Sequence, residues 1–178
     1  MALPDFRYHP NPIESCSIIE SDEECACCGQ SRGYLYAGPV YSIRDLADAV
    51  CPWCIAEGIA HRRFGATFVD EIAFQSKIPD PVRCEITQRT PGFNSWQTEQ
   101  WPCCCGDATA FLIPAGIAEL REQSALEGFA LQHIVYEMGI SGGAAKHLLE
   151  SLDRDFGPTA YVFQCLHCRR YVFHIDHA

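Results

Sequence analysis

Two groups of cysteines in this chain have the spacing that a metal ion requires of its protein ligands. The first group consists of two Cys-x-x-Cys pairs, Cys25 with Cys28 and Cys51 with Cys54. A gap of two residues lets both sulfurs of a pair bind one ion, and two such pairs complete a tetrahedral site with four cysteine ligands. The sequence therefore predicts a structural zinc site formed by Cys25, Cys28, Cys51 and Cys54.

A Cys-x-x-Cys pair can also be a redox centre, and a single cysteine is often only a small buried side chain. A redox pair is expected to begin a helix within a thioredoxin-like βαβ unit. Cys51-Pro-Trp-Cys54 precedes a predicted helix, but its flanks lack the strand pattern of such a unit. The order of turn pair, hairpin and helix-opening pair instead matches a treble-clef-like zinc finger, in which the helix N-terminus stabilises thiolate charge.

The second group combines Cys165-Leu-His-Cys168 with the three consecutive cysteines at 103–105. The late pair lies at the tip of a predicted hairpin, as in a zinc knuckle, and needs two further ligands. Neighbouring side chains of an extended strand point to opposite faces, which favours Cys103 with Cys105, whereas a turn would permit Cys104 with Cys105. We predict a second zinc site with Cys105, Cys165 and Cys168 as ligands, and the residues alone leave its fourth ligand open.

One histidine and three further cysteines are not predicted to be zinc ligands. His167 lies inside the knuckle and could replace one of its cysteines, as a minor alternative. Three cysteines are predicted to be spare thiols, either buried or incidental: Cys16, Cys27 and Cys84.

No motif in the sequence predicts an active site, so no catalytic residues are expected. A catalytic zinc keeps one position open for water and usually has histidine or carboxylate ligands, whereas each predicted site already has four thiolates. Residues 139–143 lack the Gly-Lys-Ser/Thr of a phosphate-binding loop and predict a turn between two helices. We therefore expect a protein that binds rather than an enzyme.

The expected location is the cytoplasm, without membrane contact. The first residues have neither the basic flank nor the apolar stretch of a signal peptide, and no run approaches the roughly 18 apolar residues of a membrane span. In a reducing compartment, 12 cysteines indicate metal or redox chemistry rather than disulfides.

The charge balance indicates which partners the protein can attract. The formal net charge is −10, and two four-thiolate zinc sites would take it to about −14. Such a field repels phosphate backbones and attracts basic proteins. Acidity that serves only solubility is the alternative interpretation.

The predicted elements give an α+β fold. Residues 33–36 and 40–41 predict a short hairpin, and residues 159–164 and 171–176 predict the final hairpin around the second Cys-x-x-Cys pair. Apolar periodicity and capping signals predict helices at 42–49, 55–64, 80–89, 116–124 and 126–138, and a further helix after Ser141. We predict a treble-clef-like zinc-binding region at 1–80 and a helical region with a C-terminal zinc-knuckle hairpin at 81–178, packed as one compact unit.

Several blocks of the sequence resemble the CbrC family of small bacterial proteins. They include Phe6-Arg-Tyr-His-Pro-Asn-Pro12, Arg32-Gly-Tyr-Leu-Tyr-Ala-Gly-Pro-Val-Tyr41, Cys51-Pro-Trp-Cys-Ile-Ala56, Arg89-Thr-Pro-Gly-Phe93 and Cys105-Gly-Asp107. The resemblance implies tolerance of a nuclease colicin, or immunity to another toxin, because the founding member is linked to colicin tolerance. The family commonly has His-Cys-Gly-Asp where this chain has Cys104-Cys-Gly-Asp107, which favours Cys104 over Cys103 as a ligand.

The first functional hypothesis is therefore a zinc-binding immunity or tolerance protein. Its expected partner is a bacterial toxin, and it is not expected to bind nucleic acid. Candidate contacts with the toxin are the acidic run at 20–24, Trp96 and Trp101. Alternatively, these residues only form a solvated loop or fill the core. A zinc-finger regulator that binds nucleic acid is the second hypothesis, and the scarcity of lysine argues against it. A zinc-dependent enzyme is the third.

Overall fold

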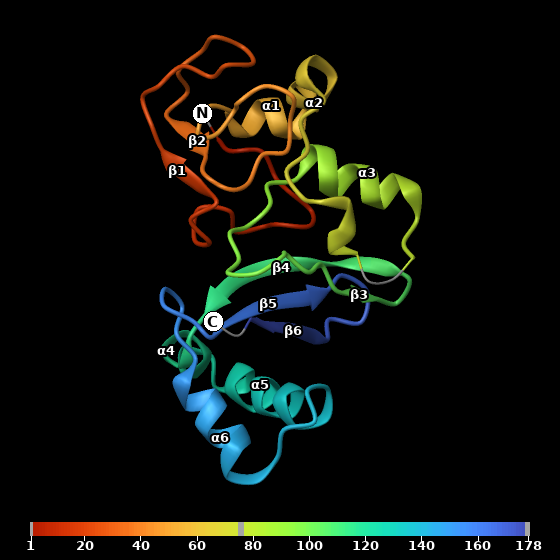
Figure 1. Ribbon diagram of the computed structural model, residues 1–178. Coiled ribbons are helices and arrows are strands. Elements are labelled where there is room, and N and C mark those ends of the chain that lie inside the picture. Colours follow the sequence, from red (N-terminus) through yellow and green to blue (C-terminus); the bar gives the residue numbers. More distant parts are fainter. Residues whose placement is uncertain (1, 75–76, 177–178) are drawn as a thin grey trace.

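The computed structural model describes residues 2–74 and 77–176 and has three layers (Figure 1). A four-stranded antiparallel sheet forms the middle layer, with the strand order β3-β4-β5-β6. The N-terminal part, with a two-stranded sheet and helices α1 to α3, lies on one side of the sheet, and helices α4 to α6 lie on the other (Figure 1). The α+β class is confirmed.

The elements follow one another in this order: β1 (Ile18–Glu20), β2 (Tyr34–Tyr36), α1 (Pro52–Ala56), α2 (Ile59–Phe64), a 3-10 helix (Glu71–Ala73), α3 (Asp80–Arg89), β3 (Cys103–Cys104), β4 (Asp107–Ala115), α4 (Ile117–Glu122), α5 (Ser124–Tyr136), α6 (Gly142–Ser151), β5 (Thr159–Cys165) and β6 (Tyr171–Asp176). The final hairpin, α3 and the helices between β4 and β5 confirm the predicted elements.

Alternating side chains of the sheet enter two different cores. Phe111, Tyr161 and Phe163 face the N-terminal part and pack there with Phe93 and Trp101. The Phe93 and Phe111 rings stack with their centroids 4.1 Å apart. The opposite face of the sheet packs against α4 to α6, as the two-residue period of a strand requires. A third cluster surrounds the first group of cysteines. The predicted division at residue 80 stays a prediction.

Three local predictions in the N-terminal part are wrong. Strand β2 pairs with β1, which precedes the first cysteine pair, and Tyr41 instead forms an isolated bridge with Thr67. Residues 42–49 form turns and bends without a helix. The predicted helix at 55–64 is two short helices, because Gly58 between them adopts the left-handed conformation with φ +66°.

Gly92 allows two segments of the N-terminal part to approach closely. A Cβ atom at this position would lie 2.0 Å from the backbone oxygen of Phe68. We expect Gly92→Ala to destabilise the protein by roughly 1–3 kcal/mol, because backbone must move to admit the methyl group. Gly128→Ala is the matched control: Gly128 lies within α5 with open space around its Cα, so alanine should stabilise by about 1 kcal/mol. Urea unfolding of both variants measures the difference, and equal effects would contradict the packing described here.

Candidate metal centres

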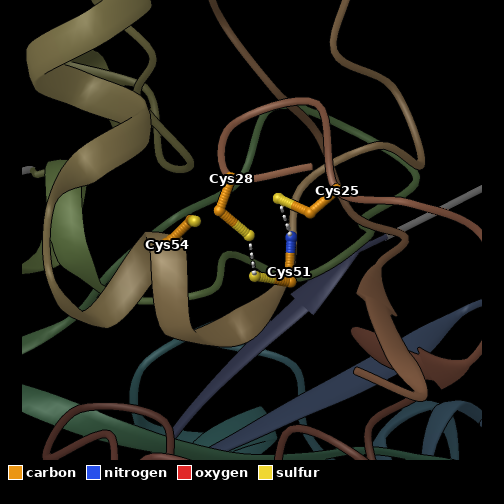
Figure 2. Close-up of side chains that lie close together, drawn as sticks. All are labelled: Cys25, Cys28, Cys51 and Cys54. Atoms are coloured by element: carbon orange, nitrogen blue, oxygen red, sulfur yellow. Dashed lines mark hydrogen bonds between the residues drawn. The ribbon is translucent and has the colours of Figure 1, made fainter. Parts of the chain in front are cut away.

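The first four predicted ligands meet in one cluster. One sulfur atom from each of Cys25, Cys28, Cys51 and Cys54 lies within 4.8 Å of all the others. Figure 2 shows Cys25 and Cys28 on the loop after β1, and Cys51 and Cys54 at the start of α1, with their side chains directed at one another. Three of the four residues are buried, and Cys28 is partly exposed. The structure therefore brings together every residue predicted for this site.

Local backbone conformation positions these sulfurs. Cys51 is the N-cap of α1 and has extended backbone, and Pro52 begins the helix. One turn later, Cys54 projects from the helix toward the same point (Figure 2). The Cys25 sulfur accepts backbone N–H groups from Cys51 at 3.2 Å and from Cys27 at 3.4 Å. Backbone donors thus favour negative charge on this sulfur.

The sulfur separations fit one tetrahedral metal ion. Cys28 Sγ and Cys51 Sγ are 3.9 Å apart. A metal–sulfur bond of about 2.3 Å places tetrahedral sulfurs about 3.8 Å apart, whereas the sulfurs of a disulfide are about 2.05 Å apart. None of these four cysteines forms a disulfide. The cluster has the geometry of four ligands around one metal ion, and the Cys28 and Cys51 sulfurs are too far apart for a disulfide.

Ionisation of the cluster favours the same interpretation. The thiols of Cys27, Cys51 and Cys54 lower the pKa of the Cys25 thiol, and the Cys51 N–H acts in the same direction. Hydrogen bonding to Cys25 raises the pKa of both Cys51 and Cys54. Since four adjacent thiolates repel one another, a divalent cation is needed for all four to ionise together.

The second cluster contains Cys104, Cys105, Cys165 and Cys168, whose sulfurs also lie within 4.8 Å of one another. Cys104 Sγ is 3.8 Å from Cys105 Sγ and 3.7 Å from Cys168 Sγ, again close to a tetrahedral edge. Burial opposes ionisation of Cys165, but the N–H groups of Cys168 and His167 lower the pKa of its thiol to about 6. This cluster differs from the first in exposure, because Cys105 and Cys168 are at the surface.

A tight turn decides which of the three consecutive cysteines join this cluster. Cys104 pairs with Asp107 across the β3–β4 hairpin, so the loop has only two residues, Cys105 and Gly106. Both have positive φ, +55° and +75°, as a type I′ turn requires. The turn brings the sulfurs of Cys104 and Cys105 together, whereas Cys103 Sγ donates to the Trp101 carbonyl at 3.7 Å. The geometry thus selects Cys104.

The other predicted residues lie outside both clusters. His167 Nε2 is 2.9 Å from Asp107 Oδ2 instead of facing the sulfurs. Cys27 is buried beside the first cluster, and Cys16 and Cys84 are exposed. In the described part of the chain, no further group of three or more histidine, cysteine or acidic side chains has its ligand atoms this close together.

Asp107 supports the second cluster, a role that was not predicted, although the residue ends the block Cys105-Gly-Asp107. Its Oδ1 accepts the Tyr8 hydroxyl at 2.9 Å and the Ala108 N–H at 2.8 Å. Its Oδ2 accepts Arg7 Nη2 at 3.1 Å and faces His167 Nε2. The carboxylate therefore connects the N-terminal segment to both hairpins of the second cluster. Its position directly after Cys105-Gly106 was the available signal.

The two candidate tryptophan contacts have different positions. Trp101 is fully buried in the central core. The prediction that it contacts a partner is therefore wrong, and the alternative, that it fills the core, is confirmed. Trp96 is 55% exposed, and the acidic residues of the 20–24 run are also at the surface. Among the residues that the structure describes, no helix has the length and apolar character to cross a membrane.

Comparisons with known proteins give matches over nearly the whole chain. The model of an uncharacterised protein family, UPF0167, matches residues 3–177. The chain is 41% identical to UPF0167 protein MT2352 of Mycobacterium tuberculosis over 178 residues, covering 99% of this chain and 94% of the relative. It is 39% identical to UPF0167 protein PA1536 of Pseudomonas aeruginosa over 176 residues, covering 98% and 97%.

No solved structure gives a significant match. The names of these relatives state no activity and mention neither CbrC nor a colicin. The match to the family model spans nearly the whole chain, including all eight clustered cysteines. The chain belongs to the uncharacterised protein family UPF0167.

Proposed function

We propose that this protein binds two zinc ions in structural four-cysteine centres and acts by binding another protein. The observation that supports zinc is the spacing of 3.7–3.9 Å between neighbouring sulfurs, in one pair of the first cluster and two pairs of the second. Thiolate ligands in tetrahedral arrangement suit zinc. An iron–sulfur cluster places several iron and sulfide atoms between its ligands and needs wider separation.

A structural role follows from the number of ligands. Four sulfurs fill the four positions of tetrahedral zinc, which leaves no position for a water molecule or substrate. The first centre is also largely buried and lies within its own hydrophobic cluster. We therefore propose a protein without enzymatic activity, in which metal holds loops and hairpins that are too short to fold alone.

The different exposure of the two centres predicts two phases of zinc release. A chelator in excess, with a coloured indicator to follow the released zinc, should first remove the ion of the second centre, where Cys105 and Cys168 are exposed. The buried ion of the first centre should leave at least about tenfold more slowly. Access of the competing ligand limits the first step, whereas local unfolding limits the second. Cys168→Ser should abolish only the fast phase. A single phase in the unsubstituted protein, or loss of the slow phase in Cys168→Ser, would contradict the assignment.

The proposed partner is a bacterial toxin domain, met in the cytoplasm. The net charge of −10 disfavours nucleic acid and favours a basic protein surface. The resemblance to the CbrC family adds colicin tolerance or toxin immunity as the biological setting. The acidic residues near 20–24 and Trp96 are exposed and available for such a contact.

Co-expression with the toxin encoded beside the gene tests this function. We expect growth to be rescued and a stable complex to be recovered by pull-down. The association rate should fall with salt more than the dissociation rate rises, because screening shortens the reach of exposed charges. Rescue without a complex would indicate action on the toxin's target. Tight binding to DNA or RNA would contradict the proposal and favour a nucleic-acid-binding regulator.

A further inference from the structure

Trp96 is an exposed aromatic side chain on an ordered frame. Its indole Nε1–H donates to Thr159 Oγ1 at 3.0 Å, and its backbone N–H donates to the Tyr161 hydroxyl at 3.3 Å. The next residue, Gln97, donates its backbone N–H to the buried Asp176 at 3.1 Å. All three anchors lie on the central sheet, so the indole has little freedom to lose on binding. Exposed, pre-ordered tryptophans of this kind often dominate protein interfaces.

A hollow of about 230 Å³ is lined by other residues of the same loop. Tyr41 and Ile72, which are 42% and 67% exposed, contribute aromatic and aliphatic surface to its lining. Asp70 and Glu99 contribute carboxylates, and none of its lining residues is lysine, arginine or histidine. Ser95 borders both this hollow and a second one lined by Trp96. The loop therefore presents an indole beside an acidic recess.

Glu99 is an unusual component of this recess because its side chain is only 4% exposed. Its Oε1 accepts the Asp70 N–H at 2.9 Å and the Tyr41 hydroxyl at 3.1 Å. Its Oε2 is buried and has no hydrogen-bond partner among the described residues. Burial raises the pKa of this carboxyl to about 7. A buried acceptor without a donor destabilises the folded state, and a nearby cation would relieve that cost.

We propose that this hollow receives the guanidinium group of an arginine from a partner protein, while Trp96 packs against an apolar residue beside that arginine. A planar guanidinium can stack on the exposed Tyr41 ring beside the Asp70 carboxylate. Attraction to Glu99 does not require direct contact, since charge interactions are strong where water is excluded. The protein nature of the partner rests on the proposed function.

The test uses nitrogen-15 NMR of the full chain at pH 8, above the pKa of about 7 that burial gives Glu99. The probe is Nα-acetyl-arginine N-methylamide, and its uncharged isostere, the citrulline derivative, is the matched control. We expect saturable shifts of the amides of Asp70, Ser95 and Thr98 with arginine, and at least about tenfold weaker binding of citrulline. Glu99→Gln should weaken arginine binding similarly. Glu137→Gln removes an equal charge elsewhere and should leave it unchanged.

Three results would overturn the proposal: equal binding of both probes, shifts confined to other surfaces, or equal weakening by Glu99→Gln and Glu137→Gln. Shifts of the same amides produced by magnesium ions, with no response to arginine, would show a metal site instead. If Glu99→Gln fails to fold, the comparison of the arginine and citrulline probes on the unsubstituted protein still tests the proposal. No toxin is involved, so failure here leaves toxin neutralisation standing, and failure of neutralisation leaves the arginine site testable.

Discussion

Replacing Cys54 by serine is expected to remove one of two zinc ions and to destabilise the protein by on the order of 5 kcal/mol. Zinc in small finger peptides contributes about 10–16 kcal/mol of apparent binding energy, and here two other cores share the burden. At roughly 2–4 °C per kcal/mol for a chain of this size, the melting temperature should fall by about 10–20 °C. Calorimetry together with metal analysis measures both effects.

Cys84→Ser provides the control for that substitution. Cys84 is exposed on α3 and belongs to neither cluster. Its replacement, like that of the exposed Cys16, should change stability by no more than about 0.5 kcal/mol and leave the zinc content unchanged. Equal losses at Cys54, Cys84 and Cys16 would mean that the thiols act individually and that no metal centre unites them.

Asp107→Ala is expected to have the second largest effect, about 3 kcal/mol of destabilisation. The change leaves the Tyr8 hydroxyl and the Ala108 N–H without their acceptor, and each buried unpaired donor costs about 1–3 kcal/mol. Arg7 and His167 are half-exposed and can turn to water, so they add less. Chemical denaturation measures the loss.

Zinc release distinguishes this role of Asp107 from a general loss of packing. The carboxylate contacts His167, between two ligands of the second centre, and follows the turn that contains Cys105. Its removal should therefore accelerate only the fast phase of zinc release. Asp22→Asn is the control, because Asp22 is exposed in the acidic run. A stability change below about 0.5 kcal/mol in Asp107→Ala would contradict the proposed role.

The sequence predicted the ligand sets because metal chemistry limits spacing strongly. Two-residue gaps identified six of the eight clustered cysteines directly. The choice between Cys103 and Cys104 depended on backbone conformation, because only a turn with two positive φ angles brings adjacent sulfurs together. Gly106 after Cys105 was a signal for such a turn, and the family pattern pointed to the same residue.

Other features could not be predicted because tertiary packing determines them. Strand β4 is a run of nine mostly buried residues, and it has no polar alternation that would reveal a strand. The 42–49 segment has a capping pattern, but its backbone forms turns that lead into the first metal cluster. Trp101 is fully buried because strands distant in sequence meet around it. The Asp107 network likewise joins residues about 100 positions apart.

The most direct measurement of the central claim is the metal content of untagged protein purified without a chelator. Inductively coupled plasma mass spectrometry should give about two zinc ions per chain, with little iron. Native mass spectrometry should show both ions on one folded chain. About one zinc ion per chain would contradict the second centre. Iron in place of zinc, or a folded protein without metal, would contradict the account as a whole.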